Sequence, residues 1–317
     1  MKLLTDIPIE KYNDTQHCYD FLNSHDTIGD EESEYNGLFH IHWRGPLDNN
    51  KIILQIKSIL ATQYVEKIYF WIENSEITIN SLNFPNLYQF KDYIEIKIFN
   101  KDVIAQAPGP KGVKTWVMHY YDQQHGDYRY KTDIFRWVVL SIHGGVYTDA
   151  DTLMLRDVKD IKINNWSSKW GVDPFAECCI LKLEKGSDAY EQMFRNDPQN
   201  PQCFLNIQNN LPQAFSYKYD NLRITSLPSA FFDIVWNEWG NEKLKFLNFN
   251  TFPKFFELTD KEVTIDTFFK GCFAFHWHNR WDAPELKNSF AGRLNVDLDR
   301  IIKEKYNITP IKIFQDE

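Results

Sequence analysis

The stretch that decides the fold is "YKTDIFRWVVLSIHGGVYTDAD", residues 130–151. From Thr132 to His143 its apolar residues recur at helical spacing on nearly every face, which predicts a buried helix. Gly144 and Gly145 follow, and glycine ends a helix in the left-handed conformation without strain. The next residues, "VYTDADTLML", are predicted to run extended from the core and to carry two carboxylates.

Those carboxylates, Asp149 and Asp151, are two residues apart, so in an extended segment they point to the same side. Such a pair can hold a hard divalent cation and leave coordination positions for phosphate oxygens. In α/β sheets, ligands bind beyond the carboxyl ends of the strands, where we expect this pair. A second D-x-D occurs at Asp297 and Asp299, and we interpret it as the polar start of a C-terminal helix, where acids are favourable.

Asp133 and Arg136 are three residues apart, so they are neighbours at the N-terminal end of the predicted helix. The pair could be a structural ion pair. A functional role is favoured, because burying an ion pair for stability is seldom worthwhile. Tyr147, two residues before the first carboxylate, could either pack in the core or contact a ligand.

The sequence upstream of this stretch predicts alternating strands and helices. The apolar patterns indicate a strand at 38–43, a helix at 51–63, and strands at 67–73 and 93–99. This order indicates an α/β layer architecture with a largely parallel sheet. From Pro284 onward the tail is predicted to be helical, and no linker or repeat divides the chain.

Composition limits the class of protein. The net charge of −9 argues against nucleic-acid binding through a general basic surface. Five cysteines without a C-x-x-C pattern indicate a reducing compartment without a disulfide framework. No signal peptide or membrane-spanning run is evident, so we expect a soluble protein in a cytoplasmic setting, whether bacterial, viral or cytosolic.

The context of the first D-x-D resembles the D-x-D glycosyltransferases with the sugar-binding-region signature (glycosyltransferase family 32-like). This group includes Och1-like mannosyltransferases, bacterial capsular-type sugar transferases and, distantly, the glucosylating clostridial toxins. Its shared run is roughly (S/A)D-x-x-R and, about eight residues later, GG-x-Y-x-D-x-D. The chain has this run at 132–136 and 144–151, with two further similar patches, "FHIHWRG" at 39–45 and "HWHNRW" at 276–281.

The resemblance implies a GT-A fold, an α/β/α Rossmann-like sandwich with a mainly parallel central sheet. One domain would span 1–317, with 38–160 binding the nucleotide sugar and 161–317 forming the acceptor side and the C-terminal closure. The implied nucleotide-sugar-binding residues are Trp43, stacked on the nucleobase, and Asp133, Arg136, Tyr147, Asp149 and Asp151. The implied ligands of Mn²⁺ or Mg²⁺ are Asp149, Asp151, His276 and His278.

The implied activity is metal-dependent transfer of a hexose-type sugar from a UDP- or GDP-sugar to a glycan or other hydroxyl acceptor, with retention. Polysaccharide biosynthesis is the expected setting, and no catalytic residue is assigned. One alternative is a metal-dependent hydrolase that uses the pairs His40/His42 and His276/His278. Another is a non-catalytic sugar-binding module built on tryptophans.

Overall fold

The computed structural model describes residues 15–29, 35–73, 84–123, 128–169, 176–187, 225–227, 229–237 and 252–314. Its centre is a seven-stranded sheet with the order β3-β2-β1-β4-β7-β6-β8. Neighbouring strands are parallel except where β7 pairs with β4 and β6, so β7 runs against the other six strands. The strands are β1 Leu38–His42, β2 Lys67–Ile72, β3 Ile94–Ile98, β4 Gly145–Thr148, β6 Trp166–Lys169, β7 Ala176–Leu183 and β8 Thr225–Leu227.

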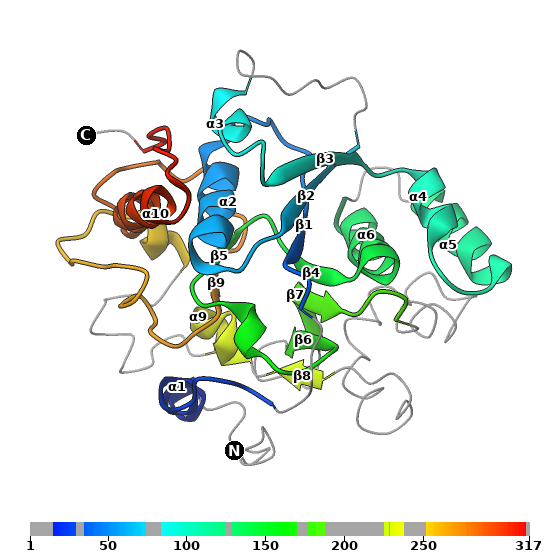
Figure 1. Ribbon diagram of the computed structural model, residues 1–317, viewed down its shortest axis with the longest axis horizontal. Helices are drawn as coiled ribbons and strands as arrows, with labels where there is room; N and C mark the ends of the chain where they lie inside the picture. The colour runs from blue at the N-terminus through cyan, green and yellow to red at the C-terminus, as the bar shows by residue number, and fades with distance from the viewer. Residues whose placement is uncertain are drawn as a thin grey trace.

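Helices cover both faces of this sheet, and Figure 1 shows α2 and α10 on one face and α4, α5 and α6 on the other. A large apolar cluster surrounds α2, and a second cluster lies under α6. The predicted α/β/α sandwich with a mainly parallel sheet is therefore confirmed. The α-helices are α1 Thr15–Ser24, α2 Asn50–Thr62, α3 Pro85–Tyr88, α4 Lys101–Gln106, α5 Lys111–Gln123, α6 Tyr128–His143, α9 Ile234–Asn237 and α10 Phe290–Tyr306, and the 3₁₀ turns are η3 Val158–Asp160, η5 Ser229–Phe231 and η7 Phe252–Phe256.

The predicted buried helix is α6, and it begins four residues before Thr132 because the polar residues 128–131 extend it beyond its apolar part. The two glycines end it as predicted. Gly144 has a φ of +70° and its amide donates to the carbonyl of Leu140 at 2.7 Å. Gly145 has a φ of +98°, and a Cβ there would lie 2.4 Å from the carbonyl oxygen of Leu38. Only glycine fits where β4 starts so close to β1.

The segment after α6 is not extended throughout, contrary to the prediction. Strand β4 ends at Thr148, residues 150–151 form a turn, and β5 (Thr152–Met154) then pairs with β9 (Ala274–His276) in a separate antiparallel sheet. The chain leaves the central sheet here because its next partner is β9, far along the sequence. The two carboxylates therefore lie at a turn between two sheets.

The second D-x-D is not the start of a helix, contrary to the prediction. Helix α10 starts at Phe290 and is capped by Ser289, whose hydroxyl accepts the amide of Gly292 at 3.0 Å. Asp297 and Asp299 therefore lie in its middle. The carboxylate of Asp297 accepts the backbone amide of Ile265 at 2.9 Å. Oδ1 of Asp299 lies 2.6 Å from Nζ of Lys57 on α2. Both acids fasten α10 to the protein.

His40 is a core residue of β1. Its Nε2 donates to the carbonyl of Gly144 at 2.9 Å, and its Nδ1 accepts the indole N–H of Trp71 at 3.1 Å. Both ring nitrogens are therefore used within the core, which contradicts the hydrolase alternative that needs His40 as a metal ligand. Burial lowers the pKa of His40 to about 3, so the imidazole is neutral in the folded protein.

This buried histidine predicts a pH dependence of folding stability. The unfolded chain binds a proton at His40 below a pKa of about 6.5, whereas the folded protein binds it only near 3. The contribution of His40 is thus present above pH 6.5 and is lost as the pH falls toward 3. Between pH 7 and pH 5 it amounts to about 2 kcal/mol of unfolding free energy.

Urea unfolding of the wild type and of His40→Gln at pH 7 and pH 5 measures this contribution. The loss of unfolding free energy between the two pH values should be smaller in the variant, because glutamine binds no proton. Equal losses in both proteins would show that His40 does not set this dependence.

Candidate active site

The first carboxylate, Asp149, is held by backbone contacts at the carboxyl end of β4. Its amide donates to the carbonyl of Cys179 on β7 at 2.7 Å. Its carbonyl accepts the side-chain amide of Gln55 on α2 at 2.5 Å. Asp149 is therefore fixed between the central sheet and the helix that covers it, at the edge where α/β proteins bind ligands.

The second carboxylate, Asp151, is held by the segment that follows β9. Its carbonyl accepts the amide of Trp277 at 3.0 Å, and its Oδ2 accepts the amide of Asn279 at 2.7 Å. Its Oδ1 lies 3.1 Å from Nε2 of His276. The pairing of Thr152 with His276 between β5 and β9 brings these distant parts of the chain together.

Asp149, Asp151 and His276 form a group suited to a divalent cation. Each offers one ligand atom, and these atoms all lie within 4.8 Å of one another. Two carboxylate oxygens and one imidazole nitrogen are donors that Mn²⁺ accepts readily, and Mg²⁺ prefers the oxygens. Two carboxylates this close repel each other, and a cation between them would offset that repulsion.

The pKa values of the group follow from this crowding. Burial raises the pKa of Asp149, Arg136 opposes the rise, and the neighbouring charge of Asp151 adds to it. Burial also acts to raise the pKa of Asp151, but His276 outweighs it and lowers that pKa to about 2. Burial acts to lower the pKa of His276, whereas the contacts with Asp151 raise it well above the usual value.

Helix α6 places a positively charged guanidinium, that of Arg136, beside the carboxylates. The guanidinium of Arg136 lies 2.9 Å from Oδ1 of Asp133 and 3.6 Å from Oδ1 of Asp149. It also lies over the ring of Tyr147, 4.9 Å from its centroid. The hydroxyl of Tyr147 donates to Oδ1 of Asp149. These four residues, all predicted from the sequence, thus form one continuous network, and Tyr147 both packs and orients Asp149.

Trp43 lies at the rim of this network. Its ring is half-buried and packs on the ring of Trp281, with centroids 4.7 Å apart. Its indole N–H donates to the carbonyl of Pro46 at 2.9 Å. Trp281 in turn donates to the side chain of Asn279 at 3.2 Å, and Asn279 contacts Asp151. This chain of contacts connects Trp43 to the carboxylates.

Lys51 on α2 fixes the turn that carries Trp281. Its buried ammonium donates to the carbonyls of Arg280, Trp281 and Ala283 at 2.8, 2.7 and 2.6 Å. An ammonium group has three donors, and these three contacts tie the turn to α2. Sequence analysis did not identify it, because its carbonyl partners are some 230 residues away along the chain.

His278 contacts a buried acid that sequence analysis missed. Its Nε2 donates to Oδ2 of Asp233 at 2.6 Å, and the rings of His276 and His278 are stacked with centroids 3.8 Å apart. Asp233, His276 and His278 form a second group that could hold a metal ion. The signal in the sequence is a lone acid within the apolar run "SAFFDIVW", which is costly to bury without a partner.

His42 lies outside both groups. Its Nδ1 is 3.2 Å from the hydroxyl of Thr132, and its Nε2 is 3.5 Å from a carboxylate oxygen of Glu73. Within the described ranges, the groups of three suited to a metal include neither His40 nor His42. The structure thus does not bring the two His-x-His pairs into one centre.

The matched family is the "Glycosyltransferase sugar-binding region containing DXD motif", whose model aligns with residues 49–169. This part of the chain matches the sugar-binding region of DXD-containing glycosyltransferases. It begins at the cap of α2, ends in β6 and contains α6 and both carboxylates of the centre. The chain is thus glycosyltransferase-like and of the enzyme class predicted from the sequence. Its sandwich, with the DXD region between β4 and β5, matches the predicted GT-A fold. No curated protein matches the chain.

Several solved glycosyltransferases resemble the structure at low identity. PaToxG glycosyltransferase is 14% identical, with 65% of this chain and 80% of that chain covered and a TM-score of 0.42. GlyE from Streptococcus pneumoniae TIGR4 is 13% identical, with coverages of 89% and 66% and a TM-score of 0.44, so the chain spans about two thirds of GlyE. The galactosyltransferase LgtC is 10% identical, with coverages of 86% and 97% and a TM-score of 0.39.

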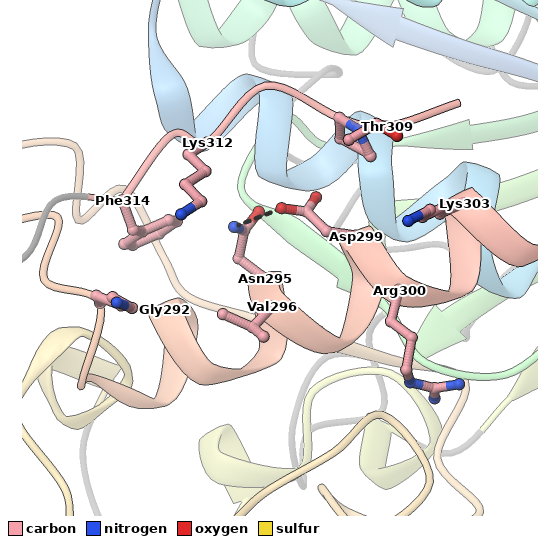
Figure 2. Close-up of a pocket in the computed structure, with 11 residues that line it drawn as sticks. Gly292, Asn295, Val296, Asp299, Arg300, Lys303, Thr309, Lys312 and Phe314 are labelled. Carbon is pink, nitrogen blue, oxygen red and sulfur yellow. Dashed lines mark hydrogen bonds between the residues drawn. The ribbon is translucent and has the colours of Figure 1, made fainter. Parts of the chain in front are cut away.

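A hollow of about 350 Å³ lies apart from this centre, between α10 and residues 309–314. Figure 2 shows Asn295, Asp299 and Arg300 of α10 beside it, with Lys312 and Phe314 on the segment that follows. None of the predicted site residues lines it.

In the part of the chain that the structure describes, no helix has the length and apolar character to cross a membrane.

Proposed function

We propose that the chain is a metal-dependent glycosyltransferase that moves a hexose-type sugar from a UDP- or GDP-sugar to a glycan or other hydroxyl acceptor, with retention. The observation that carries the proposal is the convergence of Asp149, Asp151 and His276 at the end of β4, inside the matched sugar-binding region. In one domain spanning 1–317, residues 38–160 would supply the donor side and 161–317 the acceptor side.

A divalent cation, Mn²⁺ or Mg²⁺, fits the ligand atoms of Asp149, Asp151 and His276. When bound, it supplies Lewis-acid stabilisation of the negative charge that develops on a departing nucleoside diphosphate. The residues of the chain hold this centre in place before the donor arrives. The amide of Asn279 donates to the carboxylate of Asp151, and the carbonyl of Cys179 accepts the backbone amide of Asp149. Both carboxylates are thus positioned in advance, and little reorganisation would accompany the reaction.

The remaining residues of the network suit a nucleotide sugar. Arg136 presents a planar fork of donors to anionic oxygens, and its contact with Asp149 places that fork beside the proposed cation. The carboxylate of Asp133 can accept a hydrogen bond from a hydroxyl of the ribose or of the donor sugar while it orients Arg136. The half-buried ring of Trp43 offers a face for the nucleobase, and its packing on Trp281 keeps it in place.

Arg136→Ala is expected to lower turnover of the donor roughly 10²-fold, because a charge-stabilising donor at the reacting centre is lost. The change is measured as initial rates of nucleoside diphosphate release. Arg136→Lys should recover little activity, because an ammonium lacks the planar fork. The matched control is Arg300→Ala, which removes an exposed arginine of α10 and should leave turnover unchanged. Unchanged turnover in Arg136→Ala would remove this residue from the site.

The proposal as a whole is tested with a panel of UDP- and GDP-sugars. The purified protein is incubated with each donor and either Mn²⁺ or EDTA, and the released nucleoside diphosphate is measured. We expect Mn²⁺-dependent hydrolysis of one donor, which would identify both nucleotide and sugar. No release from any donor, together with no donor-induced shift in the unfolding temperature, would contradict the proposal.

A further inference from the structure

We infer that Asp233 is a positioning residue of the cation centre, which it serves by holding the stacked pair His276 and His278. The inference rests on the proposed function, because it concerns the same centre. Asp233 touches neither carboxylate of the D-x-D, and it acts through the two imidazoles. The chemical role is that of a buried carboxylate behind a metal-ligating histidine, which fixes the tautomer and the orientation of the ring.

Asp233 lies in a rigid place. It is fully buried between η5 and α9. The preceding residue, Phe232, stacks on Trp166 of β6 with ring centroids 5.3 Å apart. Just before it, the carbonyl of Phe231 accepts the amide of Phe273, at the start of the segment that becomes β9, at 2.8 Å. The chain just before Asp233 is therefore hydrogen-bonded to the segment that leads into β9, the strand that carries His276.

Both histidines direct a ring nitrogen at one oxygen of this acid. Oδ2 of Asp233 accepts from Nε2 of His278 at 2.6 Å and lies 3.7 Å from Nδ1 of His276. The other oxygen, Oδ1, is buried and has no hydrogen-bond partner among the described residues. A buried carboxylate without charge compensation is costly, so its contacts with two imidazoles account for its presence in an apolar segment.

His276 thus has a carboxylate at each ring nitrogen. Its Nε2 faces Asp151 at 3.1 Å and its Nδ1 faces Asp233. A cation held with Asp149 and Asp151 would take Nε2 as its ligand, so the ring proton must reside on Nδ1. Oδ2 of Asp233 lies 3.7 Å from Nδ1, so a small approach of the ring on cation binding would give this proton a carboxylate acceptor and keep the lone pair of Nε2 directed at the cation.

Asp233 also helps to hold the backbone conformation of the residues after His276. His278 and Asn279 have φ angles of +49° and +59°, in the left-handed region that residues other than glycine seldom adopt. Asn279 needs this turn to direct its amide at Oδ2 of Asp151. Such strain persists only where the surroundings hold it, and the bond from His278 to Asp233 is one of the contacts that do so.

The test compares Mn²⁺ binding in the wild type and in Asp233→Asn, measured from the electron paramagnetic resonance signal of free Mn²⁺. We expect the wild type to bind one ion per chain, and the variant to bind it roughly 10- to 100-fold more weakly. The matched control is Asp297→Asn, which neutralises a buried acid on α10 and should keep the wild-type affinity. Circular dichroism verifies that each variant is folded.

The outcomes separate this inference from the proposed function. If the wild type binds no Mn²⁺, the proposed centre itself is wrong. If the wild type binds one ion and Asp233→Asn binds it equally tightly, the centre stands and the role of Asp233 is overturned. Two ions in the wild type, one of them lost in Asp233→Asn, would make Asp233 a ligand of a second ion and would also overturn the positioning role.

A measurement on the wild type keeps the inference testable if Asp233→Asn does not fold. Histidine ¹⁵N correlation spectra of the Zn²⁺-loaded protein distinguish which ring nitrogen bears the proton. We expect His276 to ligate through Nε2 with its proton on Nδ1. Ligation through Nδ1 would show that the carboxylate of Asp233 does not set the tautomer.

Discussion

Asp151→Asn is expected to abolish Mn²⁺ binding and to lower donor turnover by at least roughly 10²-fold while the protein stays folded. Asparagine keeps an oxygen that can accept the amide of Asn279, so the turn after β9 is retained. It loses the charge that faces His276 at 3.1 Å and that would balance the cation. The change is measured by nucleoside diphosphate release, Mn²⁺ binding and unfolding temperature.

Asp297→Asn is the matched control for this variant, because it removes one acid of the other D-x-D. It should retain both Mn²⁺ binding and turnover, since Asp297 accepts the amide of Ile265 and the guanidinium of Arg300 and is not part of the proposed centre. Full Mn²⁺-dependent turnover in a folded Asp151→Asn variant would rule out the role proposed for the first D-x-D.

Asp299→Ala is expected to lower the unfolding free energy by about 3 kcal/mol without affecting the cation centre. The ammonium of Lys57 is fully buried and lies 2.6 Å from Oδ1 of Asp299. Two neutral acceptors, the side chain of Asn295 and the carbonyl of Ile311, would remain at 3.1 Å. Removing the carboxylate leaves a buried cation without a counter-charge, and urea unfolding at neutral pH measures the cost.

The double variant Lys57→Met with Asp299→Leu provides the control. Replacing both partners of a buried ion pair with apolar side chains is often neutral or stabilising, so much of the lost stability should return. If Asp299→Ala unfolds at the same urea concentration as the wild type, the pair does not fasten α10 to α2.

Local patterns in the sequence predicted much of the fold. The strands β1, β2 and β3 and the helix α2 have apolar periodicities that neighbouring residues determine. The end of α6 at Gly144 was predicted because a left-handed glycine is a local requirement. The network of Asp133, Arg136 and Tyr147 was predicted as a set of site residues because it lies within one short stretch.

Features that depend on distant partners were not predicted. The turn at Asp151 forms because β5 pairs with β9, more than a hundred residues later. Asp233 was missed for the same reason, since its partners His276 and His278 lie some forty residues away and carry no local signal for it. The second D-x-D was placed at a helix start because its true partners, on α2 and near Ile265, are equally remote.

The most direct test of the account is isothermal titration of the wild type with UDP or GDP, in Mn²⁺ and in EDTA. If Asp149, Asp151 and His276 hold a cation that bridges to the diphosphate, one nucleotide should bind at least tenfold more tightly with Mn²⁺. Binding is reciprocal, so that nucleotide should also tighten Mn²⁺ binding by the same factor. Equal nucleotide affinity in Mn²⁺ and in EDTA would contradict the central claim.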